Sequence, residues 1–325
     1  MSKYTLKGSE ELDTRIDADL EIIRKKVSPH CDAGILLGGY GRGEGTPFIQ
    51  ADGTQAPFND YDLVVIVKTI SIHIRLLFQR LEKELTGQLG IPVDLCPYAR
   101  HALSSREFSL LNYEMKHGHI VIWGDDNVLD ALPNYETAII PISEGARLLM
   151  NRGKLLLDIK RRLASAKPLD EEERICFIKF INKALLAFGD AALLAAGKYD
   201  ISYAEKKLRI AAIGQMPKRD FIIAGYLGAV EMKEWGDYQT LVDYDLEQQL
   251  RKTIDVFIHF LPWYRKQYTI YECSIPKAIA LNLKWNKTLS TRHPRELLYD
   301  ALSDLLQDKP TLSHERFYEL QQRFS

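Results

Sequence analysis

The sequence predicts an α+β fold, in which a mixed sheet flanked by helices is followed by an all-helical domain. Up to about residue 140, segments with a helical repeat of apolar residues alternate with short apolar runs typical of strands. Beyond that point the helical repeat continues almost throughout. With 325 residues, of which 46% are hydrophobic, the chain is long enough to fill two cores. We therefore expect two domains, residues 1–140 and 141–325.

Local patterns predict each element of the first domain. A charged amphipathic segment at 10–27 has the helical repeat, and the apolar runs that follow it are short enough for buried strands. The expected elements are, in order, helix 10–27, strand 34–39, strand 62–67, helix 72–85, strand 92–97, helix 105–116 and strand 119–123.

The second domain is expected to consist of helices with recognisable ends. Ser143 is placed to cap a helix that begins at that point, and acidic residues open the helix that ends near Gly197. Further helices are expected at 246–264 and at the C-terminus. Within the second helix, Lys183 and Asp190 share one face, which indicates a lysine that reaches solvent and a buried, hydrogen-bonded aspartate.

Composition excludes several classes of protein. The 43 basic and 44 acidic residues nearly cancel, so a nucleic acid partner held by a strongly basic surface is not indicated. The first 21 residues lack the apolar core of a signal peptide, and charges interrupt the most apolar later stretch, 176–197. We expect a cytoplasmic protein with no membrane segment. The four cysteines form no C-x-x-C pair, which argues against a zinc site, and we expect them to be buried.

A glycine-rich turn follows the first expected strand, in the stretch GILLGGYGRGEGTP, residues 34–47. Glycine removes side chains where another backbone or a ligand must come close. The stretch has neither the Lys-Ser or Lys-Thr pair of a P-loop nor the last glycine of a dinucleotide-binding fingerprint. By itself it is compatible with a simple connecting turn.

Three acidic residues lie on the two strands that come next. Asp60 and Asp62 stand two apart at the start of a strand, so both carboxylates leave the same face, about 6 to 7 Å apart along it. Such a pair can hold hard cations. Asp94 falls inside an otherwise apolar strand, where we expect a cation or hydrogen bonds to compensate its burial.

These residues carry a family resemblance. The run GGYGRGE at 38–44, followed by NDYDL at 59–63, resembles the nucleotidyltransferase superfamily typified by DNA polymerase β. The glycine motif looks closest to protein PII uridylyltransferases and minimal nucleotidyltransferase domains, and the resemblance covers residues 35–97. It implies a nucleotidyltransferase fold for the first domain. It also implies a nucleoside triphosphate substrate and two Mg²⁺ ions held by the catalytic acids Asp60, Asp62 and Asp94.

The resemblance also implies a nucleotide site. The backbone at Gly38, Gly39 and Tyr40 is expected to cradle the phosphates, and Arg42 to meet either a phosphate or a nearby acid such as Glu44. A later stretch, GKYDISYAEKKLRI, is similar to the helical domain of antibiotic nucleotidyltransferases. It adds the nucleotide-binding candidates Tyr203, Lys206 and Lys207.

Two features depart from the family pattern. The segment between the glycines and the acids, 44–58, is longer than usual, and its length suggests a flap over the site. Tyr61 replaces the usual aliphatic residue between the acids, and strand alternation points it to the opposite face. Neither departure changes the expected metal ligands.

The expected activity is transfer of a nucleoside monophosphate from a nucleoside triphosphate to a hydroxyl of a small-molecule acceptor, with release of pyrophosphate. Two alternatives remain open at this point: a transferase that adenylylates or uridylylates a partner protein, and a nucleotide-binding module without catalysis. The three acids disfavour the second alternative. An enzyme that extends RNA is disfavoured by the lack of a basic surface.

Overall fold

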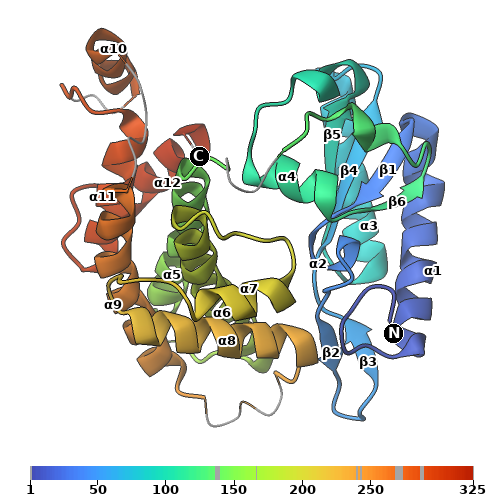
Figure 1. The fold of residues 1–325 in the computed structure, drawn as a ribbon, viewed down its shortest axis with the longest axis horizontal. Coiled ribbons are helices and arrows are strands. Elements are labelled where there is room, and N and C mark those ends of the chain that lie inside the picture. The colour runs from blue at the N-terminus through green and yellow to red at the C-terminus, as the bar shows by residue number, and fades with distance from the viewer. Residues whose placement is uncertain are drawn as a thin grey trace. The chain divides into compact units, whose positions relative to one another are not determined.

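The computed structural model describes residues 2–135, 140–165, 167–238, 241, 244–267, 274–285 and 289–324. It has the predicted α+β class (Figure 1). The chain forms two compact units, and each consists of three chain segments. The first unit comprises Met1–Pro141, Tyr199–Lys207 and Val230–Val242, and the second comprises Ile142–Lys198, Leu208–Ala229 and Asp243–Ser325.

A mixed sheet forms the centre of the first unit. Its strands are, in spatial order, β5 (Val93–Ala99), β4 (Tyr61–Val67), β1 (Ala33–Leu36) and β6 (Ile120–Trp123). Strand β1 runs antiparallel to both of its neighbours, whereas β4 and β5 are parallel. A parallel pair needs a crossover connection, and the helix α3 (Ile72–Leu89) provides it. The four strands correspond to the apolar runs of the sequence.

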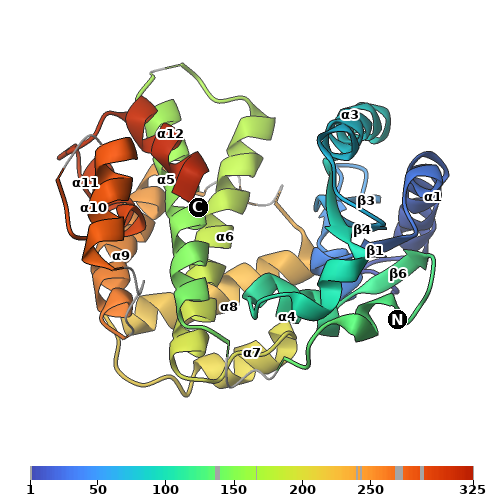
Figure 2. The same ribbon diagram turned by 90° about the horizontal axis from the view of Figure 1, so that it is seen from above.

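Helices α1 (Glu10–Val27) and α3 pack on one face of this sheet. Apolar residues of both helices form one buried cluster with the side chains of alternate strand positions, which include Tyr61, Leu63 and Leu95. Helix α4 (Leu110–His117) lies on the opposite side of the sheet from α1 (Figure 2). Tyr61 therefore points away from the face of Asp62, as expected.

The insertion between the glycines and the acids forms a hairpin that the sequence did not reveal. Strands β2 (Pro47–Ile49) and β3 (Gln55–Pro57) pair antiparallel. The side chain of Gln55 fastens the hairpin to the N-terminal segment, because it accepts a hydrogen bond from Ser9 N (2.6 Å) and donates one to Lys7 O (3.3 Å). The expected flap is thus a hairpin attached beside α1.

The second unit is helical. Helices α5 (Ser143–Leu163), α6 (Glu171–Ala195) and α9 (Leu246–Arg265) pack against one another (Figure 1). The other helices of the chain are α2 (Gly38–Gly41), α7 (Tyr203–Ile210), α8 (Arg219–Trp235), α10 (Ile275–Trp285), α11 (Pro294–Leu306) and α12 (His314–Phe324), with short 3-10 helices at Ser28–His30, Arg100–Ser105 and Val128–Ala131. In the part of the chain that the structure describes, no helix combines the length and apolarity needed to cross a bilayer.

The helix ends correct one expectation and support two others. Ser143 is the first residue of α5 and not its cap, since Ile142 occupies the cap position and makes no side-chain cap bond. Asp170 caps α6 by accepting a hydrogen bond from Glu173 N. Gly197, just beyond α6, has a φ of +64°. Asp190 is buried and accepts a hydrogen bond from the Tyr226 hydroxyl at 3.0 Å, as expected.

Two glycines of the first unit should respond oppositely to alanine. A Cβ at Gly34 would lie 2.2 Å from the Trp123 indole, so Gly34→Ala should destabilise the protein by about 1–3 kcal/mol through overpacking. Gly87 lies in α3 with no atom within 4 Å of an added Cβ, so Gly87→Ala should stabilise by about 0.5–1 kcal/mol. Urea unfolding measures both changes. A stable Gly34→Ala protein would contradict the packing of β1 against β6.

Candidate functional site

Two of the predicted catalytic acids are neighbours in the sheet. In the parallel pairing of β4 with β5, Asp62 is the register partner of Asp94. Partners on adjacent strands point to the same face, and the strands lie about 4.8 Å apart. Asp60 stands one residue before β4, two positions from Asp62. The sheet therefore brings Asp62 and Asp94 side by side, and Asp60 next to them along the chain.

Asp94 differs from its expectation in one respect, because it is exposed and not buried. Strand β5 alternates: Val93 and Leu95 face the core, whereas Asp94 and Cys96 face outward. The apolar residues Val93 and Leu95 on either side of Asp94 point to the other face of the strand, so the carboxylate of Asp94 is in contact with solvent. Cys96, also expected to be buried, is exposed for the same reason. Cys31 and Cys176 are half-buried, so the expectation is wrong for them too, and Cys273 lies outside the described residues.

The glycine turn lies directly against Asp62. Leu37 N donates to the backbone oxygen of Asp62 at 2.8 Å, and the next residue, Gly38, has a φ of +65°. A Cβ at Gly38 would lie 2.5 Å from Oδ2 of Asp62. The backbone conformation therefore favours glycine, and the turn lies against the side chain of Asp62.

Lys233 is a site residue that the sequence did not reveal. It lies on the part of α8 that belongs to the first unit. A Cβ at Gly39 would lie 3.0 Å from Nζ of Lys233. The local sequence EMKEW has no feature that would single this lysine out. Only the fold places a positive charge beside the second glycine of the motif.

Tyr40 is held within the fold by its side chain. It is 1% exposed, and its hydroxyl accepts hydrogen bonds from Phe58 N (2.8 Å) and Asn59 N (3.1 Å). It also donates to the carbonyl oxygen of Thr46 at 3.4 Å. Burial raises the pKa of the phenol above its ordinary value, so the group stays protonated and can donate. The side chain of Tyr40 is thus engaged within the fold, so the predicted contact with a nucleotide could involve only its backbone.

Arg42 takes the ion-pair alternative. Its Nη1 lies 3.3 Å from Oε2 of Glu114, and its Nε lies 3.6 Å from Oε2 of Glu44, with the side chain 10% exposed. Burial opposes the charge, but Glu114, two tyrosines and Glu44 outweigh it and raise the pKa of Arg42 above its ordinary value. Glu44 Oε1 in turn accepts from Tyr203 N at 2.9 Å. Arg42 and Glu44 therefore join the glycine turn to residues 199–207.

Residues 199–207 belong to the first unit, and they contain the three later nucleotide-binding candidates, Tyr203, Lys206 and Lys207. Lys206 is 1% exposed, and its Nζ donates to the hydroxyl of Tyr199 at 3.2 Å. Lys207 pairs with Glu234 at 2.5 Å. Cations border the ring of Tyr203, at distances to its centroid of 4.6 Å for Lys206, 5.5 Å for Lys233 and 5.9 Å for Arg42. Positive charge thus gathers close to Gly39.

The acids fit a cation that arrives with its substrate. Among the described residues, no three His, Cys, Asp or Glu side chains are gathered into a metal-holding group. Mg²⁺ is usually held by one or two carboxylates together with substrate phosphates, and not by a complete protein cage. Asp60 and Asp62 offer the hard oxygen donors that it prefers, and the carboxylate of Asp62 lies against Gly38.

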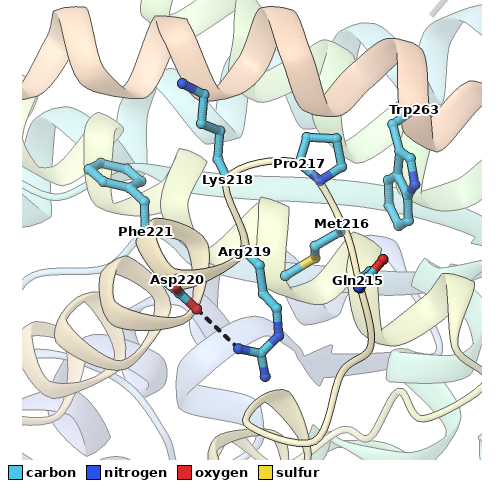
Figure 3. A pocket seen from close by; sticks show the side chains of 8 residues that line it. All are labelled: Gln215, Met216, Pro217, Lys218, Arg219, Asp220, Phe221 and Trp263. Atoms are coloured by element: carbon cyan, nitrogen blue, oxygen red, sulfur yellow. Dashed lines mark hydrogen bonds and ion pairs between the residues drawn. The ribbon is translucent and has the colours of Figure 1, made fainter.

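The second unit contains a hollow of about 550 Å³ (Figure 3). Its cations serve the fold: Lys218 pairs with Asp255 at 2.7 Å, and Arg219 donates to the carbonyl oxygens of Ile213 and Ala211 at 3.0 and 2.9 Å. Its lining offers no arrangement of catalytic groups like that of the first unit. The lining residues are Gln215, Met216, Pro217, Lys218, Arg219, Asp220, Phe221 and Trp263.

Comparison with known proteins adds no assignment. No model of a protein family matches the chain, and no curated protein matches it. The function is therefore argued from the geometry of the acids, the glycine turn and the surrounding cations.

Removal of Glu114 should destabilise the first unit. Glu114→Ala leaves the buried Arg42 with Glu44 alone and removes the acceptor of the Tyr199 hydroxyl, so we expect a loss of about 2 kcal/mol. Glu21→Ala is the matched control, because Glu21 pairs with Arg24 in solvent and its loss should change stability little. Urea unfolding compares the two. Equal effects would show that the Arg42 network does not support the fold.

Proposed function

We propose that this protein is a Mg²⁺-dependent nucleotidyltransferase with a nucleotidyltransferase fold in its first unit. It transfers a nucleoside monophosphate from a nucleoside triphosphate to a hydroxyl of a small-molecule acceptor and releases pyrophosphate. The observation that carries this proposal is the contact of Gly38 with Asp62, which is the register partner of Asp94. It joins a turn suited to phosphate with a pair of acids suited to a metal.

The triphosphate binds along the glycine turn. The backbone N–H groups of Gly38 and Gly39 approach its oxygens. Lys233 supplies a positive charge beside Gly39, and Lys206 adds one near the Tyr203 ring. Arg42 contributes through the field of its charge and through the support it gives to the turn.

Asp60 and Asp62 would hold the divalent cations, and Asp94 would take part in their ligation. When bound, the cations neutralise charge on the triphosphate and stabilise the pyrophosphate that leaves. Asp62 lies between the glycine turn and Asp94, which suits it to ligate on both sides. Positioning and electrostatics then supply most of the rate enhancement.

Asp94 acts on the acceptor. The acceptor oxygen forms a bond to the α-phosphorus while the bond from that phosphorus to the bridging oxygen breaks, and pyrophosphate leaves with the electron pair. The acceptor's proton passes to the carboxylate of Asp94. Because Asp94 is exposed, it can return that proton to solvent after each turnover.

The edge of the sheet beside Asp94 favours a small acceptor. Val93 N donates to Oγ1 of Thr86 at 3.0 Å, Leu95 N donates to Oε1 of Glu82 at 2.8 Å, and Pro97 has no N–H. Three outward N–H positions of β5 are therefore occupied or absent, which disfavours the addition of a peptide to this edge as a further strand. A protein acceptor would need another mode of binding.

Substitution of the acids should separate binding from chemistry. Asp60→Asn and Asp62→Asn should abolish Mg²⁺-dependent transfer, whereas Asp94→Asn should keep most triphosphate affinity and lower turnover by about 10² to 10⁴. Labelled triphosphates offered to metabolite pools and to lysate measure transfer, and titration with a non-hydrolysable triphosphate measures affinity. Label on a protein would instead support the protein-modifying alternative. Wild-type transfer by either Asp60→Asn or Asp62→Asn, at matched melting temperature, would overturn the proposal.

Lys233→Met should weaken triphosphate binding about tenfold, because it removes a charge beside Gly39 while keeping the length of the side chain. The loss should shrink at high salt, since screening already weakens that interaction. Lys26→Met is the control, as Lys26 pairs with Glu84 between α1 and α3. Equal affinities of the Lys233→Met and Lys26→Met proteins would exclude Lys233 from the phosphate site.

A further inference from the structure

The hydroxyl of Tyr40 lies at the point where the inserted hairpin leaves and rejoins the site. It accepts from the amides of Phe58 and Asn59 and donates to the carbonyl of Thr46. Asn59 completes the closure, because its Oδ1 accepts from Thr46 N at 2.6 Å. One side chain of the glycine motif thus ties both ends of the hairpin together, and the residue after Asn59 is Asp60.

We propose that Tyr40 is a positioning residue, whose hydroxyl fixes Asp60 relative to the glycine turn. This role rests on the proposed nucleotidyl transfer, since it concerns the same acids and the same turn. Tyr40 directly follows Gly39 in the chain, and its two acceptor bonds end one and two residues before Asp60. The hydroxyl therefore connects the phosphate side of the site to the metal side without touching either ligand.

The ring of Tyr40 is itself held in place. It packs against Tyr61 with ring centroids 5.5 Å apart, and its other side meets Gly45, where a Cβ would lie 2.1 Å from Cδ1. The aromatic ring cannot shift without moving one of these neighbours. Because the ring is held in place, its hydroxyl is held too, and so are the amides of Phe58 and Asn59 that donate to it.

The base of the hairpin depends on the hydrogen bonds to the Tyr40 hydroxyl. Its strands are three residues long each, and a two-stranded ribbon of that size has little stability of its own. Gln55 fastens the hairpin at its turn end, opposite Ile49, whereas Phe58 and Asn59 follow its base. Without the bonds to Tyr40, the bond between Asn59 and Thr46 would be left to hold this base, and Asp60 would follow its motion. Catalytic groups tolerate displacements of only about 0.5 Å, so this motion would reach the reaction.

Tyr40→Phe tests the inference, with Tyr61→Phe as its matched control. Each change removes one buried hydroxyl and keeps the ring, but Tyr61 donates to Oδ2 of Asp19 on α1 at 2.9 Å and not to a group beside Asp60. In the Tyr40→Phe protein, hydrogen exchange at the amides of Phe58 and Asn59 should quicken about tenfold. The Mn²⁺ affinity of the protein with a bound non-hydrolysable triphosphate should fall by a similar factor, while Tyr61→Phe changes neither quantity.

The outcomes separate this inference from the proposed function. Unchanged exchange in Tyr40→Phe, or equal loss of Mn²⁺ affinity in both variants, would overturn the positioning role even if the wild-type protein transfers nucleotides. Faster exchange with unchanged Mn²⁺ affinity would also overturn it, because the hydroxyl would then hold the hairpin alone. If wild-type protein binds no triphosphate, the proposed function fails and the role of Tyr40 in it fails too, whereas the exchange rates still report on the hydroxyl.

Discussion

The close approach of Gly38 to Asp62 is the constraint on which the rest of the first unit depends. It needs a left-handed residue without a side chain two positions after the end of β1, and it needs β4 to run antiparallel beside that strand. Once β4 is in this place, its other edge accepts β5, and the register brings Asp94 next to Asp62. The placement of the two carboxylates beside the glycine turn follows from one backbone contact.

Around this contact the structure balances charge at short range. Arg42 is buried between Glu114 and Glu44, and Glu44 also receives the backbone N–H of Tyr203. A buried charge is tolerated when partners compensate its desolvation. The bonds of Glu44 also hold residues 199–207 against the glycine turn. The network that compensates the charge of Arg42 therefore also holds the segment that contains Lys206.

Much of the first unit could be predicted from its sequence, because buried strands leave apolar runs and Asp60 and Asp62 interrupt such a run at its start. The exposure of Asp94 could not be predicted from the sequence. A strand that is buried on one face and a strand that is buried on both faces can have similar apolar residues. The hairpin strands are too short to leave a pattern. Lys233 could not be predicted, because its place in the site depends on its contact with Gly39, nearly two hundred positions earlier in the chain. No local motif encodes such a contact.

The first unit is assembled from three separate stretches of chain, and the last of them begins at Val230. During synthesis the strands and the glycine turn therefore leave the ribosome long before the residues that surround Arg42 and Gly39 exist. At translation rates of about 5–20 residues per second, the chain needs some five to twenty seconds to extend from residue 141 to residue 242. For that interval the acids and the turn can be formed while Lys206 and Lys233 are still absent. The positive charge beside the glycines arrives last, so a nascent chain should pass through a stage that has the sheet and the glycine turn but lacks Lys206 and Lys233.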